Sequence, residues 1–147
     1  MLKVTFFQEM KQMKGRVFID SNIFLYAFSD KDISKQAISA EIVQQKFSIS
    51  TQVLNEVSNN MIKKLNFSNK EIEKFIISCY SQYDIINFSK EVFIKASSIR
   101  DLYNISYYDS LILASAINSK CDIIYSEDMQ HNQKIENLTI VNPFKEI

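Results

Sequence analysis

The sequence predicts a three-layer α/β/α domain, in which helices cover both faces of a central parallel sheet. Short apolar runs alternate along the chain with longer segments of helical periodicity. Strands separated by helices pair in parallel, because each helix carries the chain back to the edge where the next strand begins. The 147 residues are 46% apolar, which suits one domain with one core.

The first half of the chain is expected to contain two strands and three helices. They are a strand over 17–20, a helix over 22–28, a helix over 34–47, a strand over 47–51 and a helix over 51–65. The run "VFID" has the length of a short buried strand, and Ala37, Ile38 and Ile42 have helical spacing. Thr51 is the candidate N-cap of the third helix.

The second half is expected to contain three helices and three strands. They are a helix from Ser68 to about residue 80, a strand over 83–88, a helix over 89–102, a helix after Ser106, a strand over 121–126 and a strand over 138–142. Ser68 and Glu71 have the spacing of a capping box, as do Ser106 and Asp109. The apolar run "SLILASAI" after Asp109 predicts a helix buried on most sides.

Composition excludes several classes of protein. Gly15 and Pro143 are the only glycine and proline, so glycine-rich phosphate loops and dinucleotide fingerprints are excluded. Cys79 and Cys121 lack metal-type spacing, which favours a reduced, cytoplasmic protein. We expect neither a membrane span nor a signal peptide. The formal net charge is zero, so nucleic-acid binding would need a local basic patch.

Four carboxylates are expected at one edge of the sheet. Asp20 ends the first strand and Asp128 follows the run "IIYS", while Asp109 and Glu56 lie early in their helices. Ligands of open α/β sheets bind beyond the carboxyl ends of the strands. These four side chains are therefore candidates for a common site.

Each acid also has a purely structural interpretation. Asp20 can cap the helix that follows it, and Asp109 can close the capping box of Ser106. Glu56 lies opposite an apolar stripe, where a glutamate is usually solvated. Glu127 is placed as well as its neighbour Asp128 to be the acid of that loop.

A shared site would require a cation. Two carboxylates about 4 Å apart repel by about 1 kcal/mol in water and by about 4 kcal/mol at an effective dielectric constant of 20. Mg²⁺ or Mn²⁺ is the natural counter-charge for such oxygen ligands. Zinc is not expected, because the chain has no cluster of Cys and His residues.

These motifs resemble one known family. The segments "VFIDSNIFLYAF", "STQVLNEV", "SYYDSLILASA", "CDIIYSEDMQ" and "IVNPF" are similar, in this order, to PIN-domain ribonucleases, specifically the VapC toxins of VapBC toxin–antitoxin pairs. The resemblance implies a PIN-like fold, with Asp20 and Asp109 as direct ligands of Mg²⁺ or Mn²⁺. It implies that Glu56 and Asp128 complete the site directly or through water.

The resemblance also implies roles for neighbouring side chains. Ser21, Asn22 and Ser126 would orient the carboxylates by hydrogen bonds. Lys63, Lys64, Arg100 and His131 are candidates for RNA contacts, although surface solubility is the more usual role for such cations. The implied activity is hydrolysis of RNA, for example tRNA or ribosomal RNA, by metal-activated water. The implied partners are a cognate antitoxin and a second copy of the chain.

Two departures from the family stand out. Many relatives carry Trp where this chain has Tyr108, which we expect to pack as an aromatic residue in its place. Residues 1–12 form an N-terminal extension before a single domain over 13–147. The alternatives to a toxin are a stand-alone RNA-processing PIN nuclease and a non-catalytic, metal-binding interaction domain.

Overall fold

The computed structural model describes residues 15–145, and within that range the chain forms six helices and six strands. The expected extension, residues 1–12, lies outside the described residues. The helices are α2 (Ser21–Ala27), α3 (Ile33–Val43), α4 (Thr51–Leu65), α5 (Asn69–Gln82), α6 (Lys90–Leu102) and α7 (Tyr107–Asn118). The strands are β1 (Val17–Ile19), β2 (Ser48–Ser50), β3 (Asp84–Ile86), β4 (Ile123–Tyr125), β5 (Lys134–Ile135) and β6 (Leu138–Val141).

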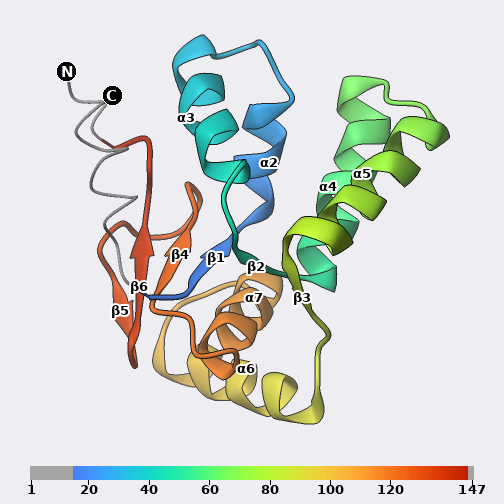
Figure 1. The fold of residues 1–147 in the computed structure, drawn as a ribbon. Coiled ribbons are helices and arrows are strands. Elements are labelled where there is room, and N and C mark those ends of the chain that lie inside the picture. The colour runs from blue at the N-terminus through green and yellow to red at the C-terminus, as the bar shows by residue number, and fades with distance from the viewer. Residues whose placement is uncertain (1–14, 146–147) are drawn as a thin grey trace.

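The strands form one mostly parallel sheet in the order β3-β2-β1-β4-β6-β5. In the central pair, Ile19 of β1 lies beside Tyr125 of β4, so both strands end at the same edge. β2 and β3 end there as well, with Ser50 beside Ile86. The predicted parallel α/β architecture is therefore confirmed. In Figure 1, α2 and α3 lie above the sheet, α6 and α7 below it, and the α4–α5 hairpin at its side.

The core contains the central strands and one almost fully enclosed helix. Phe18, Ile124 and Ile140 of the sheet are fully buried. Seven consecutive residues of α7, from Ser110 to Ala116, are also buried. The prediction that this helix is buried on most sides is confirmed. No helix of the described chain is long and apolar enough to cross a membrane.

Several predicted boundaries need correction. The N-cap of α4 is Ser50 rather than Thr51, because the Ser50 hydroxyl accepts a hydrogen bond from the backbone N–H of Val53. The helix predicted over 34–47 ends at Val43, which leaves a turn before β2. β5 was not predicted. It is two residues long and pairs antiparallel with β6, so it carries almost no periodic signal of its own.

Candidate active site at the carboxyl edge of the sheet

Asp20 lies where β1 becomes α2. Its backbone N–H donates to the carbonyl oxygen of Tyr125 at 3.0 Å, which extends the β1–β4 pairing by one residue. Its side chain caps α2, with Oδ1 accepting from the N–H of Ser21 at 2.8 Å. Oδ2 accepts from the hydroxyl of Ser126 at 2.8 Å. The carboxylate is only 3% exposed, so the N-cap interpretation is correct and yet does not account for such burial.

The electrostatic environment of Asp20 disfavours its ionised form. Burial raises the pKa of this carboxyl to about 7, and the charges of Glu56 and Asp109 act in the same direction. The hydrogen bonds from Ser126 and Ser21 oppose the shift without cancelling it. Asp20 is therefore a buried acid with two acidic neighbours.

Glu56 reaches the same edge from the second turn of α4. Its Oε2 accepts from the hydroxyl of Ser21 at 2.8 Å, and its Oε1 accepts from the amide of Gln52 at 3.0 Å. The side chain is partly buried and both of its oxygens accept hydrogen bonds, so it does not simply project into solvent. Because Ser21 follows Asp20 directly, its hydroxyl ties Glu56 to the end of β1.

Asp109 is in the first turn of α7, where its backbone N–H donates to the hydroxyl of Ser106 at 3.3 Å. Burial raises the pKa of its carboxyl, and the charges of Asp128 and Glu56 raise it further. Asp109 thus interacts with acids on both sides. Together with the effects on Asp20, this brings all four predicted acids into one electrostatic cluster.

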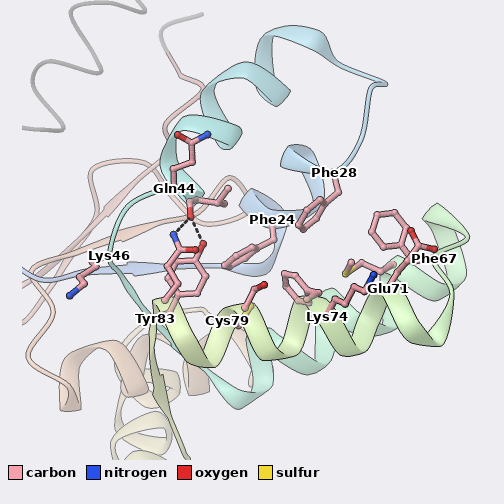
Figure 2. A pocket seen from close by; sticks show the side chains of 14 residues that line it. Phe24, Phe28, Gln44, Lys46, Phe67, Glu71, Lys74, Cys79 and Tyr83 are labelled. Atoms are coloured by element: carbon pink, nitrogen blue, oxygen red, sulfur yellow. Dashed lines mark hydrogen bonds between the residues drawn. The ribbon is translucent and has the colours of Figure 1, made fainter.

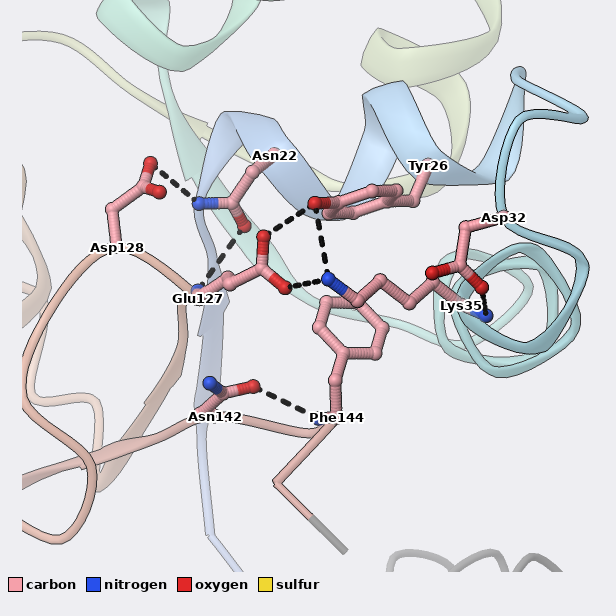
Figure 3. Close-up of polar contacts among 8 residues, drawn as sticks. All are labelled: Asn22, Tyr26, Asp32, Lys35, Glu127, Asp128, Asn142 and Phe144. Carbon is pink, nitrogen blue, oxygen red and sulfur yellow. Dashed lines mark hydrogen bonds and ion pairs between the residues drawn. The ribbon is translucent and has the colours of Figure 1, made fainter. Parts of the chain in front are cut away.

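Asp128 and Glu127 differ in their partners, as Figure 3 shows. Asp128 accepts from the side-chain amide of Asn22 at 2.9 Å, and the oxygen of that amide accepts from the N–H of Glu127. Glu127 instead forms an ion pair with Lys35 at 2.5 Å and accepts from the hydroxyl of Tyr26. Glu127 is therefore neutralised, whereas Asp128 belongs to the acid cluster.

The donor set fits a hard divalent cation. Carboxylate oxygens are the ligands that Mg²⁺ and Mn²⁺ prefer, and within residues 15–145 no Lys or Arg forms a salt bridge with the four acids. In that same range no three acids converge closely enough to hold an ion as they stand. Cation binding would therefore require the acidic side chains to move closer together.

The predicted RNA contacts have different surroundings. Arg100 donates to the hydroxyls of Ser110 and Ser97 and lies over the ring of Tyr107, so its guanidinium joins α6 to α7. His131 accepts from the backbone N–H of Asn142 through Nδ1, which anchors the end of β6. Lys63 and Lys64 are exposed in the last turn of α4. Of these two, Lys64 lines a pocket that also includes Asp128.

Sequence reasoning missed three partners of the acids. Lys35 and Tyr26 hold Glu127, and Gln52 holds Glu56. The Gln52–Glu56 spacing of four residues on one helix was the only local signal for any of them. Tyr108 contacts the ring of Tyr107 edge-on, with 5.3 Å between centroids, but it is 58% exposed, so it packs on its neighbour and not in the interior.

The fold and the cluster together define an α/β domain with an acidic site at the carboxyl edge of its sheet. The sequence model of the PIN domain matches residues 17–135, and the chain belongs to that family. The family match supports a nuclease, that is, a hydrolase acting on nucleic acid. No curated protein shows significant sequence similarity to the chain.

Solved structures share the fold at low sequence identity. A toxin–antitoxin complex from Klebsiella pneumoniae is 20% identical with a TM-score of 0.67, covering 87% of this chain and 98% of that chain. VapBC2 from Rickettsia felis, bound to promoter DNA, is 20% identical with a TM-score of 0.61, covering 84% and 96%. VapC20 from Mycobacterium tuberculosis, described as a toxin that cleaves the sarcin–ricin loop, is 13% identical with a TM-score of 0.61, covering 76% and 89%.

Proposed function

We propose that the protein is an endoribonuclease that depends on Mg²⁺ or Mn²⁺, and that it is the toxin of a type II toxin–antitoxin pair. The observation that carries this proposal is the cluster of Asp20, Glu56, Asp109 and Asp128, in which burial, with the neighbouring acidic charges adding to it, raises the pKa of Asp20 and Asp109. Membership of the PIN family supports the nuclease class. The two cysteines are buried and unpaired, which suits a reducing cytoplasm.

Each acid has a proposed role. Asp20 and Asp109 would hold the cation directly, and Glu56 and Asp128 would do so directly or through water. When bound, a divalent cation supplies Lewis acidity for a phosphate and a nucleophilic water at neutral pH. The chain itself contributes orientation, because hydroxyl and amide donors fix the carboxylates. These donors are Ser126 for Asp20, Ser21 for Glu56 and Asn22 for Asp128.

RNA is the proposed substrate by analogy with the Mycobacterium tuberculosis protein, which is described as a toxin that cleaves the sarcin–ricin loop. Transfer RNA and ribosomal RNA are the substrates to examine first. A map of cut sites on total RNA would identify the target.

Cleavage should need both the cation and Asp20. We expect purified protein to cut total RNA with Mg²⁺ or Mn²⁺ and not with EDTA, and the Asp20→Asn variant to be inactive under both conditions. Asp101→Asn is the matched control, because Asp101 is an exposed acid of α6 and the chemical change is identical. Cleavage by Asp20→Asn at the wild-type rate would refute the site.

Cation binding has a second readout. Millimolar Mg²⁺ or Mn²⁺ should raise the melting temperature of wild-type protein and not that of Asp20→Asn, because binding to the folded state alone stabilises it. A raised melting temperature without cleavage of any RNA would favour the non-catalytic, metal-binding alternative.

The antitoxin has a proposed place on the surface. An apolar groove of about 1010 Å³ lies between α2 and the α4–α5 hairpin, and its lining includes Phe24, Phe28, Phe67 and Phe75 (Figure 2). Phe28 is 38% exposed. Toxin–antitoxin complexes share this fold, so we assign the groove to an amphipathic segment of the cognate antitoxin.

The toxin proposal is tested in cells. Expression should arrest growth, and the product of an adjacent antitoxin-sized gene should relieve the arrest and co-purify with the protein. Phe28→Ser should weaken co-purification, whereas Ile94→Ser, which alters an exposed residue of α6, should not. Cleavage without growth arrest would favour a stand-alone RNA-processing nuclease. The proposed homodimer is tested by sedimentation equilibrium.

A further inference from the structure

We propose that a pocket next to the acid cluster binds the nucleotide adjacent to the scissile phosphate, with Lys31 and Lys64 holding its phosphate group. The inference rests on the proposed function and adds the substrate subsite. The pocket has a volume of about 330 Å³. Its lining includes Asn22, Tyr26, Lys31, Lys64, Glu127 and Asp128.

The pocket is continuous with the candidate active site. Asn22 and Asp128 line it, and the same two side chains form the hydrogen bond that holds the last acid of the cluster. A phosphodiester placed at the acids therefore has its neighbouring nucleotide at the mouth of this pocket. The volume is at the small end of the range for ligand sites, which suits a single nucleotide rather than a longer segment.

Two structural features bring the lysines to the pocket. Helix α4 ends at Leu65 because Asn66 adopts a left-handed conformation, with a φ of 56°, and Lys64 is consequently in its last turn. Lys31 follows α2, and its backbone N–H donates to the hydroxyl of Ser29, which also lines the pocket. The two ammonium groups thus come from segments far apart in the sequence.

The lining contains two lysines, Lys31 and Lys64, and two acids, of which Glu127 is already paired with Lys35; within residues 15–145 the two lysines therefore face one carboxylate without an ammonium partner, that of Asp128. In the described chain neither Lys31 nor Lys64 forms a salt bridge, whereas Lys35 is already paired with Glu127. A helix C-terminus favours a lysine for its dipole, but Lys63 meets that need equally and does not line the pocket. Two ammonium groups beside a nuclease-type site are most simply used to hold a phosphate of the strand.

The pocket lining other than the lysines suits the base and ribose of a nucleotide. Leu25 and Leu65 contribute apolar surface, and Asn22 contributes an amide close to the opening. A base or ribose can contact such a surface while its phosphate lies near the lysines. Inorganic phosphate can also bind the lysines, but it has no group that contacts the apolar side chains of Leu25 and Leu65.

The first test measures the salt dependence of RNA binding without cleavage. A labelled, short oligouridylate is titrated by fluorescence anisotropy in EDTA over a range of KCl concentrations. The slope of log K against log salt is negative, and removing one ammonium group that pairs with a phosphate of single-stranded RNA should make it less steep by about 0.7. We therefore expect Lys31→Met and Lys64→Met each to reduce the steepness by about 0.7, and the double variant by about 1.4.

Lys120→Met is the matched control. Lys120 is exposed and precedes β4, so it lies at the opposite edge of the sheet from the acids. We expect its slope to equal that of the wild type. Unchanged slopes for both Lys31→Met and Lys64→Met would overturn the inference.

The second test locates the ligand. Uridine 5′-monophosphate, uridine and inorganic phosphate are titrated separately into ¹⁵N-labelled protein in EDTA. The monophosphate should shift the amide signals of Ser29 and Leu65 more strongly than either of its parts, and the double variant should abolish the effect. Equal shifts with inorganic phosphate would overturn the assignment to a nucleotide and leave a general phosphate site.

The two proposals can fail separately. Metal-dependent RNA cleavage combined with unchanged slopes would refute the pocket and leave the nuclease standing. Nucleotide binding in the pocket without cleavage of any RNA would refute the nuclease and leave the pocket as a nucleotide-binding site.

Discussion

Replacing Asp20 by Asn is expected to stabilise the cation-free protein at alkaline pH and to have little effect at acid pH. The carboxyl has a pKa of about 7 in the folded protein against an ordinary value of 3.8. The difference, 7 minus 3.8, is about 3 pH units, and each unit is worth about 1.36 kcal/mol. Keeping Asp20 ionised in the folded state therefore costs about 4 kcal/mol once the pH is well above 7.

The direction follows from proton binding. Because the folded state has the higher pKa, it binds more protons than the unfolded chain between about pH 4 and pH 7. The contribution of Asp20 to the free energy of unfolding thus falls as the pH rises through this window. An Asn side chain carries no such charge, and its amide oxygen can still accept from the N–H of Ser21 while its amide group donates to Ser126.

The measurement is urea-induced unfolding in EDTA, followed by circular dichroism. The free energy of unfolding of Asp20→Asn minus that of wild type should be near zero at about pH 4 and reach as much as about 4 kcal/mol at about pH 8. Asp101→Asn, at an exposed position, should differ from wild type by less than about 0.5 kcal/mol at both values. A difference for Asp20→Asn that does not vary with pH would refute the reasoning.

Three further predictions test the surroundings of the site. In a double-mutant cycle measured by chemical denaturation, Lys35→Met and Glu127→Gln should show a coupling energy of about 1 kcal/mol, because the side chains of the pair are only about a quarter exposed. Additive effects of the two substitutions would contradict the ion pair. Tyr108→Ser should change the free energy of unfolding by less than about 0.5 kcal/mol, because the ring is largely exposed and its ring contact is with the similarly exposed Tyr107. A large decrease would contradict this. Gly15→Ala should destabilise the folded protein by about 1 kcal/mol or more, because Gly15 has a φ of +131° and a Cβ at this position would meet the carboxylate of Asp122. An unchanged melting temperature would contradict that close approach.

Local chemistry explains which parts of the fold could be predicted. The starts of α5 and α7 were anticipated because Ser68 and Ser106 each accept from the N–H three residues later, a contact contained within one turn. The boundary at α4 was missed by one residue because two hydroxyl residues, Ser50 and Thr51, stand side by side. β5 depends on pairing with β6, and such pairing leaves no trace in two residues.

The acid cluster could be anticipated because strand ends and helix starts determine one edge of a parallel sheet. The hydrogen bonds that hold the cluster could not, since they join residues far apart in sequence. Ser21 and Glu56 are separated by 35 positions, and Lys35 and Glu127 by 92. Only the tertiary fold selects these partners. From the local sequence Glu127 and Asp128 were equivalent, and the family resemblance alone favoured Asp128 before the positions of Lys35 and Asn22 were known.

Glu127 and Asp128 illustrate two ways of accommodating an acid at this edge. Glu127 has an ammonium partner, which cancels its charge and holds the loop to α3. Asp128 has only the neutral amide of Asn22, which satisfies an oxygen lone pair and leaves the negative charge in place. Ser126 serves Asp20 in the same manner. Neutral donors hold these carboxylates in place but do not cancel their charges, so the carboxylates repel each other. A cation bound between them would relieve that repulsion. A lysine in place of the neutral donors, Asn22 and Ser126, would pair with the carboxylates and stabilise the fold. It would also remove the unbalanced charge that favours a metal ion.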